Sequence, residues 1–312
     1  MWTMGHNDWI KYGWGDDLHN TWQRGDSLVI DFTNGNEPFE KLSPLDAAID
    51  AVNKIVATHP APYTLMCSGG VDSQAMMWAW LKSGHPFNVV SIKYVSNGTW
   101  FNDHDLDTLV QFTEKNNIPV TYYEFDIIDF LENGELQKIS VANDCQSPHI
   151  CTYIKMSQLI TSGTILFSGN WLSPDISGLN YTILGCHRYA FTNLNIGKNQ
   201  HMIPYFLNYT PLLAYSAMVS DLPGITDKNS QYSKHGFEII NTFQKFTGFE
   251  KIKDRYDSIK LTIPYQERLI VASRESSRAF DIIFRYGLEY GSKLYNKNTA
   301  KVINKLTKKD FK

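Results

Sequence analysis

Tyr63-Thr-Leu-Met-Cys-Ser-Gly-Gly-Val-Asp-Ser73 is the stretch that decides how this chain is organised. It begins with a short apolar run typical of a buried strand, passes through two glycines and continues into residues that favour a helix. Because glycine adopts backbone angles closed to other residues, the Gly69-Gly70 turn can direct successive N–H groups at one anion. A helix that begins near Val71 adds its positive end at the same place. The order of strand, glycine turn and helix therefore predicts a phosphate-binding loop.

The side chains of this loop have the chemistry that a nucleotide phosphate requires. Ser68 and Ser73 supply hydroxyl donors, and Asp72 supplies a carboxylate suited to holding a hydrated Mg²⁺ against phosphate oxygens. The loop differs from a Walker A loop because no lysine follows its glycines. Two other interpretations fit the same residues: a structural Gly-Gly turn before a helix, and a loop that binds nucleotide without turnover.

The segment Ser68-Gly-Gly-Val-Asp-Ser73 resembles the signature of the PP-loop ATP pyrophosphatases, the family of asparagine synthetase, GMP synthetase, NAD synthetase and several nucleobase-modifying enzymes. The resemblance implies an N-type member of the adenine nucleotide alpha hydrolase-like superfamily. Such enzymes cleave ATP between the α and β phosphates, adenylate a carbonyl or carboxylate oxygen, and let a nucleophile displace AMP. ATP and Mg²⁺ are then the expected cofactors. Catalytic work is expected of Asp72 and Ser73, and phosphate binding of Ser68, Gly69, Gly70, Val71, Asp72 and Ser73.

A second segment, Thr164-Ile-Leu-Phe-Ser-Gly-Asn-Trp-Leu-Ser-Pro-Asp175, is similar to the strand end of GMP and NAD synthetases, where an acidic residue helps to hold Mg²⁺. The similarity implies nucleotide binding by Gly169 and Asn170, and places Asp175 beside Asp72 as a metal ligand. The spacing before Asp175 differs by one residue from that of GMP synthetase. A simple Ser-Pro-Asp turn explains the same residues.

Two further nucleotide contacts are candidates. In the family the end of the second strand frames adenine through backbone groups, and here that region is Ile92-Lys93-Tyr94-Val95. Lys93 is a candidate phosphate ligand, or alternatively an exposed strand end. Ser147, before Pro148, is a plausible helix N-cap whose neighbouring N–H groups could bind a phosphate or a substrate carboxylate.

The whole chain reads as an α/β protein. Strands are expected at 63–67, 87–95 and 120–125, and helices at 71–83, 105–116 and 148–160, an alternation that predicts a doubly wound, Rossmann-like parallel sheet with helices on both faces. Ligands of such sheets bind at the carboxyl ends of the strands. Residues 61–225 are expected to form the ATP pyrophosphatase domain, residues 1–60 an N-terminal extension packing on it, and residues 226–312 a mainly helical C-terminal lobe.

Composition limits the classes of protein that fit. The 312 residues, 43% of them hydrophobic, can fill a large core, and no run of about 18 apolar residues or basic-apolar leader is present, so a cytoplasmic protein without membrane segments is expected. The four cysteines form no CxxC pair, which weighs against zinc-bearing and paired-cysteine relatives. Cys145 and Cys151 could be a thiol pair, although buried single cysteines are commoner.

The charge pattern argues against wholesale nucleic-acid binding, because the net charge is −3. One local exception is the C-terminus, where lysines recur every four residues, as on one face of a helix: Lys293, Lys297, Lys301 and Lys305. A solvated terminal helix explains them more simply than an RNA-binding arm. Four tryptophans before residue 60 could stack bases, but packing of the extension is the simpler interpretation.

These observations lead to a functional hypothesis. The chain is expected to be an AMP-forming ligase that makes an amide on a small-molecule carboxylate or carbonyl acceptor, like asparagine synthetase without its glutaminase domain, so ammonia would come from solution, an ammonia-supplying partner or an amine substrate. Arg188, Lys228 and Lys234 are candidate cations for pyrophosphate or substrate. A nucleobase- or tRNA-modifying enzyme and a nucleotide-binding module without turnover are the alternatives, and assembly as a homo-oligomer is left open.

Overall fold

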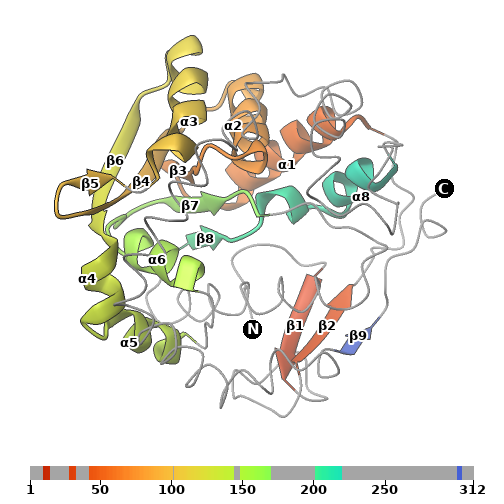
Figure 1. The fold of residues 1–312 in the computed structure, drawn as a ribbon. Helices are drawn as coiled ribbons and strands as arrows, with labels where there is room; N and C mark the ends of the chain where they lie inside the picture. Colours follow the sequence, from red (N-terminus) through yellow and green to blue (C-terminus); the bar gives the residue numbers. More distant parts are fainter. Residues whose placement is uncertain are drawn as a thin grey trace, which may run out of the picture.

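Five parallel strands form the main sheet (Figure 1). The computed structural model describes residues 10–14, 28–32, 42–100, 102–143, 148–169, 201–219 and 301–303. The parallel strands are β3 (Tyr63–Met66), β4 (Asn88–Ser96), β6 (Val120–Asp126), β7 (Thr164–Phe167) and β8 (His201–Ile203), in the spatial order β6-β4-β3-β7-β8. A short strand, β5 (Thr99–Trp100), pairs antiparallel with the end of β4. The predicted α/β class is thus confirmed.

The strand order reverses direction in the middle of this sheet. From β3 the chain adds β4 and then β6 on one side, and it later adds β7 and β8 on the other. Consecutive parallel strands on opposite sides leave a crevice at the carboxyl edge between β3 and β7, where ligands of such sheets bind. The loop that follows β3 is therefore placed at the reversal.

Alternating side chains of the strands divide the core in two. Leu65 belongs to the hydrophobic cluster on one face of the sheet, whereas its neighbour Met66 belongs to the cluster on the other. Helices α1 (Pro44–Thr58), α2 (Val71–Ser83), α3 (Asp103–Lys115) and α8 (Pro211–Val219) contribute to the first cluster. Helices α4 (Ile127–Glu132), α5 (Glu135–Ala142) and α6 (Pro148–Ser157) contribute to the second. Helices consequently cover both faces.

Helix α1 shows how directly the sequence specifies these elements. Ser43 caps it by accepting a hydrogen bond from the backbone N–H of Asp46, and Pro44 occupies the first position, where its missing N–H costs nothing. Its buried face consists of small and branched apolar side chains at helical spacing: Ala47, Ala48, Ala51, Val52 and Ile55. These side chains join the same cluster as Leu65, so α1 packs as part of the main core.

A small second sheet brings together distant parts of the chain. Strand β2 (Leu28–Phe32) pairs antiparallel with β1 (Ile10–Trp14) and parallel with β9 (Lys301–Ile303). The lysine spacing predicts a helix across Lys301, and this prediction is wrong for those three residues. Val302 and Ile303 extend along β2 instead, because backbone pairing with an apolar strand outweighs a helical charge pattern. The rest of the expected helical lobe, 226–300 and 304–312, lies outside the described residues.

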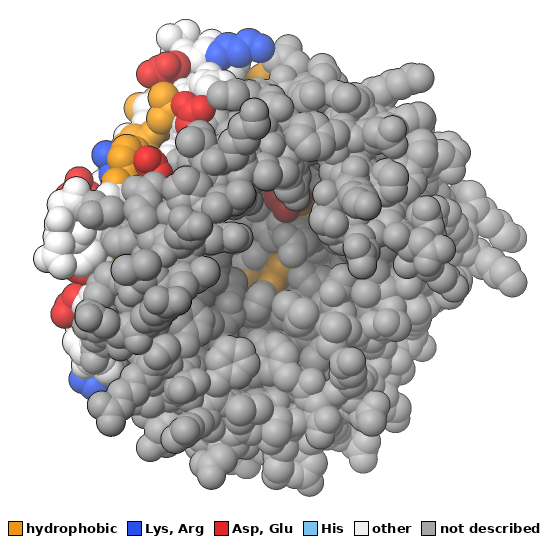
Figure 2. Space-filling model, in the orientation of Figure 1, with side chains coloured by type: hydrophobic (Ala, Val, Ile, Leu, Met, Phe, Trp, Pro, Cys, Tyr) orange, Lys and Arg blue, Asp and Glu red, His pale blue; other side chains and the backbone are white. Residues whose placement is uncertain are grey.

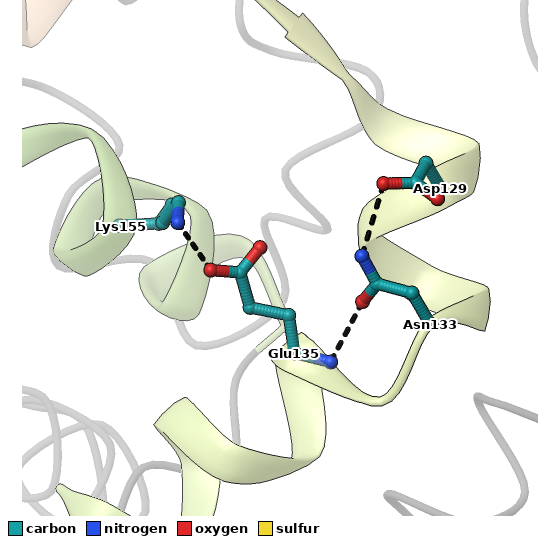
Figure 3. A network of polar contacts seen from close by, with 4 residues as sticks. All are labelled: Asp129, Asn133, Glu135 and Lys155. Atoms are coloured by element: carbon teal, nitrogen blue, oxygen red, sulfur yellow. Dashed lines mark hydrogen bonds and ion pairs between the residues drawn. The ribbon is translucent and has the colours of Figure 1, made fainter.

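Short polar contacts organise the three helices on the second face (Figure 3). The side chain of Asn133 donates to Asp129 at 2.9 Å and accepts from the backbone N–H of Glu135 at 2.8 Å, which turns the chain from α4 into α5. Glu135 also forms an ion pair with Lys155 of α6. These contacts hold α4, α5 and α6 as one layer against the sheet.

The described surface carries mixed charge on the face shown in Figure 2. Acidic, basic and hydrophobic side chains alternate along the margin where Figure 1 places α3, β5 and α4. Within the described ranges, no helix has the length and apolar character needed to cross a membrane.

Candidate functional site

The predicted loop connects β3 to α2 at the carboxyl edge of the sheet. The backbone N–H of Cys67 still donates to Val90 of β4 at 2.9 Å, so the chain leaves the sheet only at Ser68. Gly70 is the N-cap residue of α2, which begins at Val71 as the sequence predicts. The positive end of this helix therefore points toward the crevice between β3 and β7.

The two glycines play different roles. Gly69 has φ +83°, a left-handed conformation that favours glycine, as expected of an anion-binding turn. Gly70 has φ −66° and ψ 162°, which any residue can adopt, so the expectation of unusual backbone angles at both glycines is wrong for Gly70. Both glycines are buried and Ser68 is half-buried. One left-handed residue is thus sufficient to turn the chain from strand to helix.

The carbonyl groups of the loop are bonded from the helix side. The hydroxyl of Ser73 donates to the carbonyl of Gly70 at 2.8 Å, and the backbone N–H of Gln74 donates to the same oxygen at 3.0 Å. The side-chain Nε2 of Gln74 donates to the carbonyl of Gly69 at 2.7 Å. Ser73, predicted as a phosphate donor, is buried here and directs its proton at the loop carbonyl.

Gln74 is a residue that the sequence analysis does not single out. It follows the motif by one position, and glutamine on a first helical turn is an ordinary helix residue with no motif of its own. Its position five residues after Gly69 is the available signal, since a long amide can reach back over one turn of helix.

Asp72 lies in the first turn of α2 and is half-buried. A carboxylate at a helix N-terminus is stabilised in its charged form by the helix dipole. Among the described residues no three His, Cys, Asp or Glu side chains form a metal-binding group. A hydrated Mg²⁺ nonetheless fits, because it is commonly held by one or two carboxylates together with substrate phosphates.

Cys67, the last residue before the loop, has no nucleophilic role here. The hydroxyl of Ser91 donates to its backbone carbonyl at 2.6 Å, which ties the start of the loop to β4. Its thiol is buried, and burial raises the pKa of Cys67 far above its ordinary value. The thiol therefore stays protonated, whereas a reactive cysteine needs a lowered pKa. Cys151 is likewise buried in the core, and Cys145 lies outside the described residues.

The end of β7 meets the end of β8 beside the loop. Gly169 has φ +66°, and a Cβ placed there would lie 2.1 Å from Cδ1 of Tyr205. The backbone N–H of Leu207 also donates to the carbonyl of Ser168 at 3.0 Å. Gly169 is thus required by the close approach of Tyr205, independently of any ligand. Asn170 and Asp175, predicted to bind nucleotide and metal, lie outside the described residues.

Lys93 contacts two aromatic rings. Its Nζ lies 4.8 Å from the ring centroid of Trp100 and 4.9 Å from that of Tyr122. Lys93 is the third residue after Val90, which pairs with the last residue of β3, so it lies about 10 Å beyond the end of that strand. These cation–π contacts give Lys93 a structural role on β4.

Asn102 occupies the strand edge expected to frame adenine. Its Nδ2 donates to the carbonyl of Ile92 at 2.8 Å, and its Oδ1 accepts from the backbone N–H of Tyr94 at 2.8 Å. The indole N–H of Trp100 donates to the same Oδ1 at 2.9 Å. Asn102 is buried, so two of the backbone groups of Ile92–Val95 are already bonded within the chain.

The remaining predicted residues lie outside the described structure. They are Ser147, Arg188, Lys228 and Lys234.

Comparison with known proteins does not identify a family. No protein-family model matches this chain, and no curated protein matches it significantly. The loop and its position in the sheet are therefore the basis for a functional proposal.

Proposed function

We propose that this chain is an ATP pyrophosphatase of the PP-loop type, which cleaves ATP to AMP and pyrophosphate, adenylates a carboxylate or carbonyl oxygen, and then forms an amide. The observation that carries the proposal is the position of Ser68-Gly-Gly-Val-Asp-Ser73 at the point where the strand order reverses. Helices on both faces of the sheet support the doubly wound, adenine nucleotide alpha hydrolase-like fold that belongs to this proposal.

The proposed chemistry needs positioning and electrostatic stabilisation more than a protein nucleophile. An oxygen of the acceptor attacks the α-phosphorus, and the bond from that phosphorus to the oxygen bridging to the β-phosphate breaks. Pyrophosphate leaves with the bonding electrons, and a nitrogen nucleophile then displaces AMP from the adenylate. The N–H groups of the loop and the positive end of α2 face the charge that develops on pyrophosphate. The protonated thiol of Cys67 takes no part.

Asp72 is the described residue that would hold Mg²⁺, with Asp175 proposed as its second ligand. When bound, the ion would offset the negative charge of the phosphates. The acceptor is proposed to be a small molecule, and the nitrogen to come from ammonia, an ammonia-supplying partner or an amine substrate.

Product analysis with Mg²⁺-ATP tests this proposal. The purified protein is incubated with ATP alone and with a pooled metabolite extract, and nucleotide and phosphate products are separated. AMP and pyrophosphate are expected from the wild type, with a loss on the order of a hundredfold in Asp72→Ala. Asp46→Ala is the matched control, since Asp46 is also a first-turn carboxylate, on α1.

Each other outcome of the product analysis would indicate a different function. ADP as product, or tight ATP binding without turnover, would contradict the ligase and leave a nucleotide-binding module. Stimulation by an RNA fraction in place of a small-molecule fraction would favour a nucleobase-modifying enzyme. A loss of activity that is equal in Asp46→Ala and Asp72→Ala would assign the effect to helix stability.

A further inference from the structure

We propose that Gln74 is the positioning residue of the loop: its side-chain amide fixes the peptide between Gly69 and Gly70 so that the Gly70 N–H faces a bound phosphate. The inference rests on the proposed function, because it concerns the same phosphate-binding loop. It adds a residue outside the motif and assigns it a mechanical role.

The carbonyl of Gly69 and the N–H of Gly70 belong to one peptide unit. A trans peptide is planar, and its C=O and N–H point in opposite directions. Gln74 Nε2 holds the carbonyl of Gly69 toward the helix at 2.7 Å. The N–H of Gly70, in the same peptide, must then point away from the helix.

The next peptide is held in the same way. The carbonyl of Gly70 accepts from both the hydroxyl of Ser73 and the backbone N–H of Gln74. The N–H of Val71 therefore also points away from the helix body. Two successive N–H groups directed outward, with a left-handed residue before them, form the concave arrangement that binds anions.

The conformational freedom of Gly69 also matters. With φ +83° and no side chain, this residue has little intrinsic resistance to rotation of its following peptide. Gly70 is an N-cap without a side-chain cap bond. The amide of Gln74, buried at 9% exposure, supplies the direction that glycine lacks. Three hydrogen bonds from the neighbouring residues Ser73 and Gln74 thus hold both loop carbonyls.

The test compares binding of magnesium pyrophosphate by calorimetry to the wild type, Gln74→Leu and Gln74→Glu. Gln74→Leu removes the donor, and Gln74→Glu places a carboxylate against the Gly69 carbonyl. Both are expected to bind pyrophosphate more weakly by on the order of tenfold. The control for the substitution itself is Gln111→Leu, which removes an exposed helix hydrogen bond, from Nε2 of Gln111 to Asp107 at 3.0 Å on α3, and is expected to bind like the wild type.

Thermal unfolding separates positioning from general loss of structure. A variant that is folded at the temperature of the calorimetry and still binds pyrophosphate more weakly has lost the orientation of the loop and not its fold.

The outcomes distinguish this inference from the proposed function. If the wild type binds pyrophosphate and both Gln74 variants bind equally well, the positioning role is contradicted and the proposed function stands. Weaker binding by Gln74→Glu alone, with Gln74→Leu binding like the wild type, also contradicts it, because repulsion by the new carboxylate then explains the loss. If the folded wild type binds neither pyrophosphate nor ATP, the proposed function fails and this inference fails with it.

Discussion

At the scale of single residues, the described part of the site contains glycines whose conformations have different causes. Gly69 turns the phosphate-binding loop, whereas Gly169 makes room for the ring of Tyr205. A sequence motif predicts that both glycines bind ligand. The sequence does not show whether the space beside a glycine is occupied by a phosphate or by a tyrosine ring. Substitutions can separate these causes.

Gly169→Ala is expected to reduce the free energy of unfolding by about 3 kcal/mol, since it combines a positive φ with a Cβ inside the Tyr205 ring. Gly84→Ala is the control: Gly84 has φ +74° with no atom near the added Cβ, so about 1 kcal/mol is expected. Urea unfolding measures both. In a Tyr205→Ala background the cost of Gly169→Ala should fall toward that of the control, since only the backbone Cα of residue 205 stays close to the added Cβ, and an unchanged cost would contradict the steric explanation.

The buried thiol of Cys67 is expected to make the folded protein less stable as the pH becomes alkaline. Because its folded pKa is raised above the unfolded value of about 8.5, its contribution is complete below that pH and is lost as the pH rises above it. Burial also raises the pKa of Tyr63. The pKa of Tyr122 is raised by burial and, to a smaller extent, by the nearby charge of Glu114. Urea unfolding between pH 8 and pH 10.5 should show a smaller decline for Cys67→Ala than for the wild type. Equal slopes would contradict this account of the thiol.

At the scale of elements, the loop and the ends of β4, β7 and β8 converge on one edge of the sheet. Helix α2 follows the predicted bounds because its caps are local: a glycine turn begins it, and Gly84 in a left-handed conformation ends it. Strand β8 is only three residues long, and it forms by pairing with β7, which lies far earlier in the chain. Local sequence patterns carry no signal for such pairing.

Asn102 shows what a sequence pattern cannot supply. Its carboxamide bonds to backbone groups of β4 beyond Val90, where the pairing with β3 ends. The residue is also the N-cap of α3, without a side-chain cap bond. Nothing near Asn102 in the sequence distinguishes it from an ordinary helix-starting asparagine. The resemblance to known synthetases predicts adenine contacts through backbone groups here, and two of these groups are bonded within the chain.

Asn102→Ala is expected to lower the free energy of unfolding by about 3 kcal/mol, because it leaves a carbonyl and two N–H groups without their partner. Asn116→Ala is the matched control, since Asn116 ends α3 with one side-chain bond, to Phe112 at 2.8 Å, and should cost about 1 kcal/mol. Chemical denaturation measures both. Equal losses of unfolding free energy in the two variants would contradict the stabilising role of the Asn102 hydrogen bonds at the end of β4.

At the scale of the whole molecule, one sheet separates two hydrophobic clusters. The alternation of strands and helices predicts this layering, since apolar strands covered on both faces read as continuous hydrophobic runs. The order of the strands is not predictable in the same way, because it depends on which crossover packs on which face. The reversal at β3, which gives the loop its position, became evident only from the pairing.

The two clusters are expected to unfold together. Leu65→Ala opens the first cluster and Met66→Ala the second, and each should lower the free energy of unfolding by roughly 2–5 kcal/mol. Because both side chains belong to one strand, circular dichroism and tryptophan fluorescence should report a single coincident transition in each variant. Separate transitions for the two probes would show that the faces fold independently.

The most direct test of the account is where ATP binds. Protein labelled with ¹⁵N at its 20 glycines is titrated with Mg²⁺-ATP, and the Gly70 amide resonance is assigned with a Gly70→Ala variant. The account predicts that the Gly69 and Gly70 resonances shift most, while Gly84, at the far end of α2, stays unchanged. Saturable ATP binding that leaves both loop glycines unshifted would place the nucleotide elsewhere and contradict the proposed site.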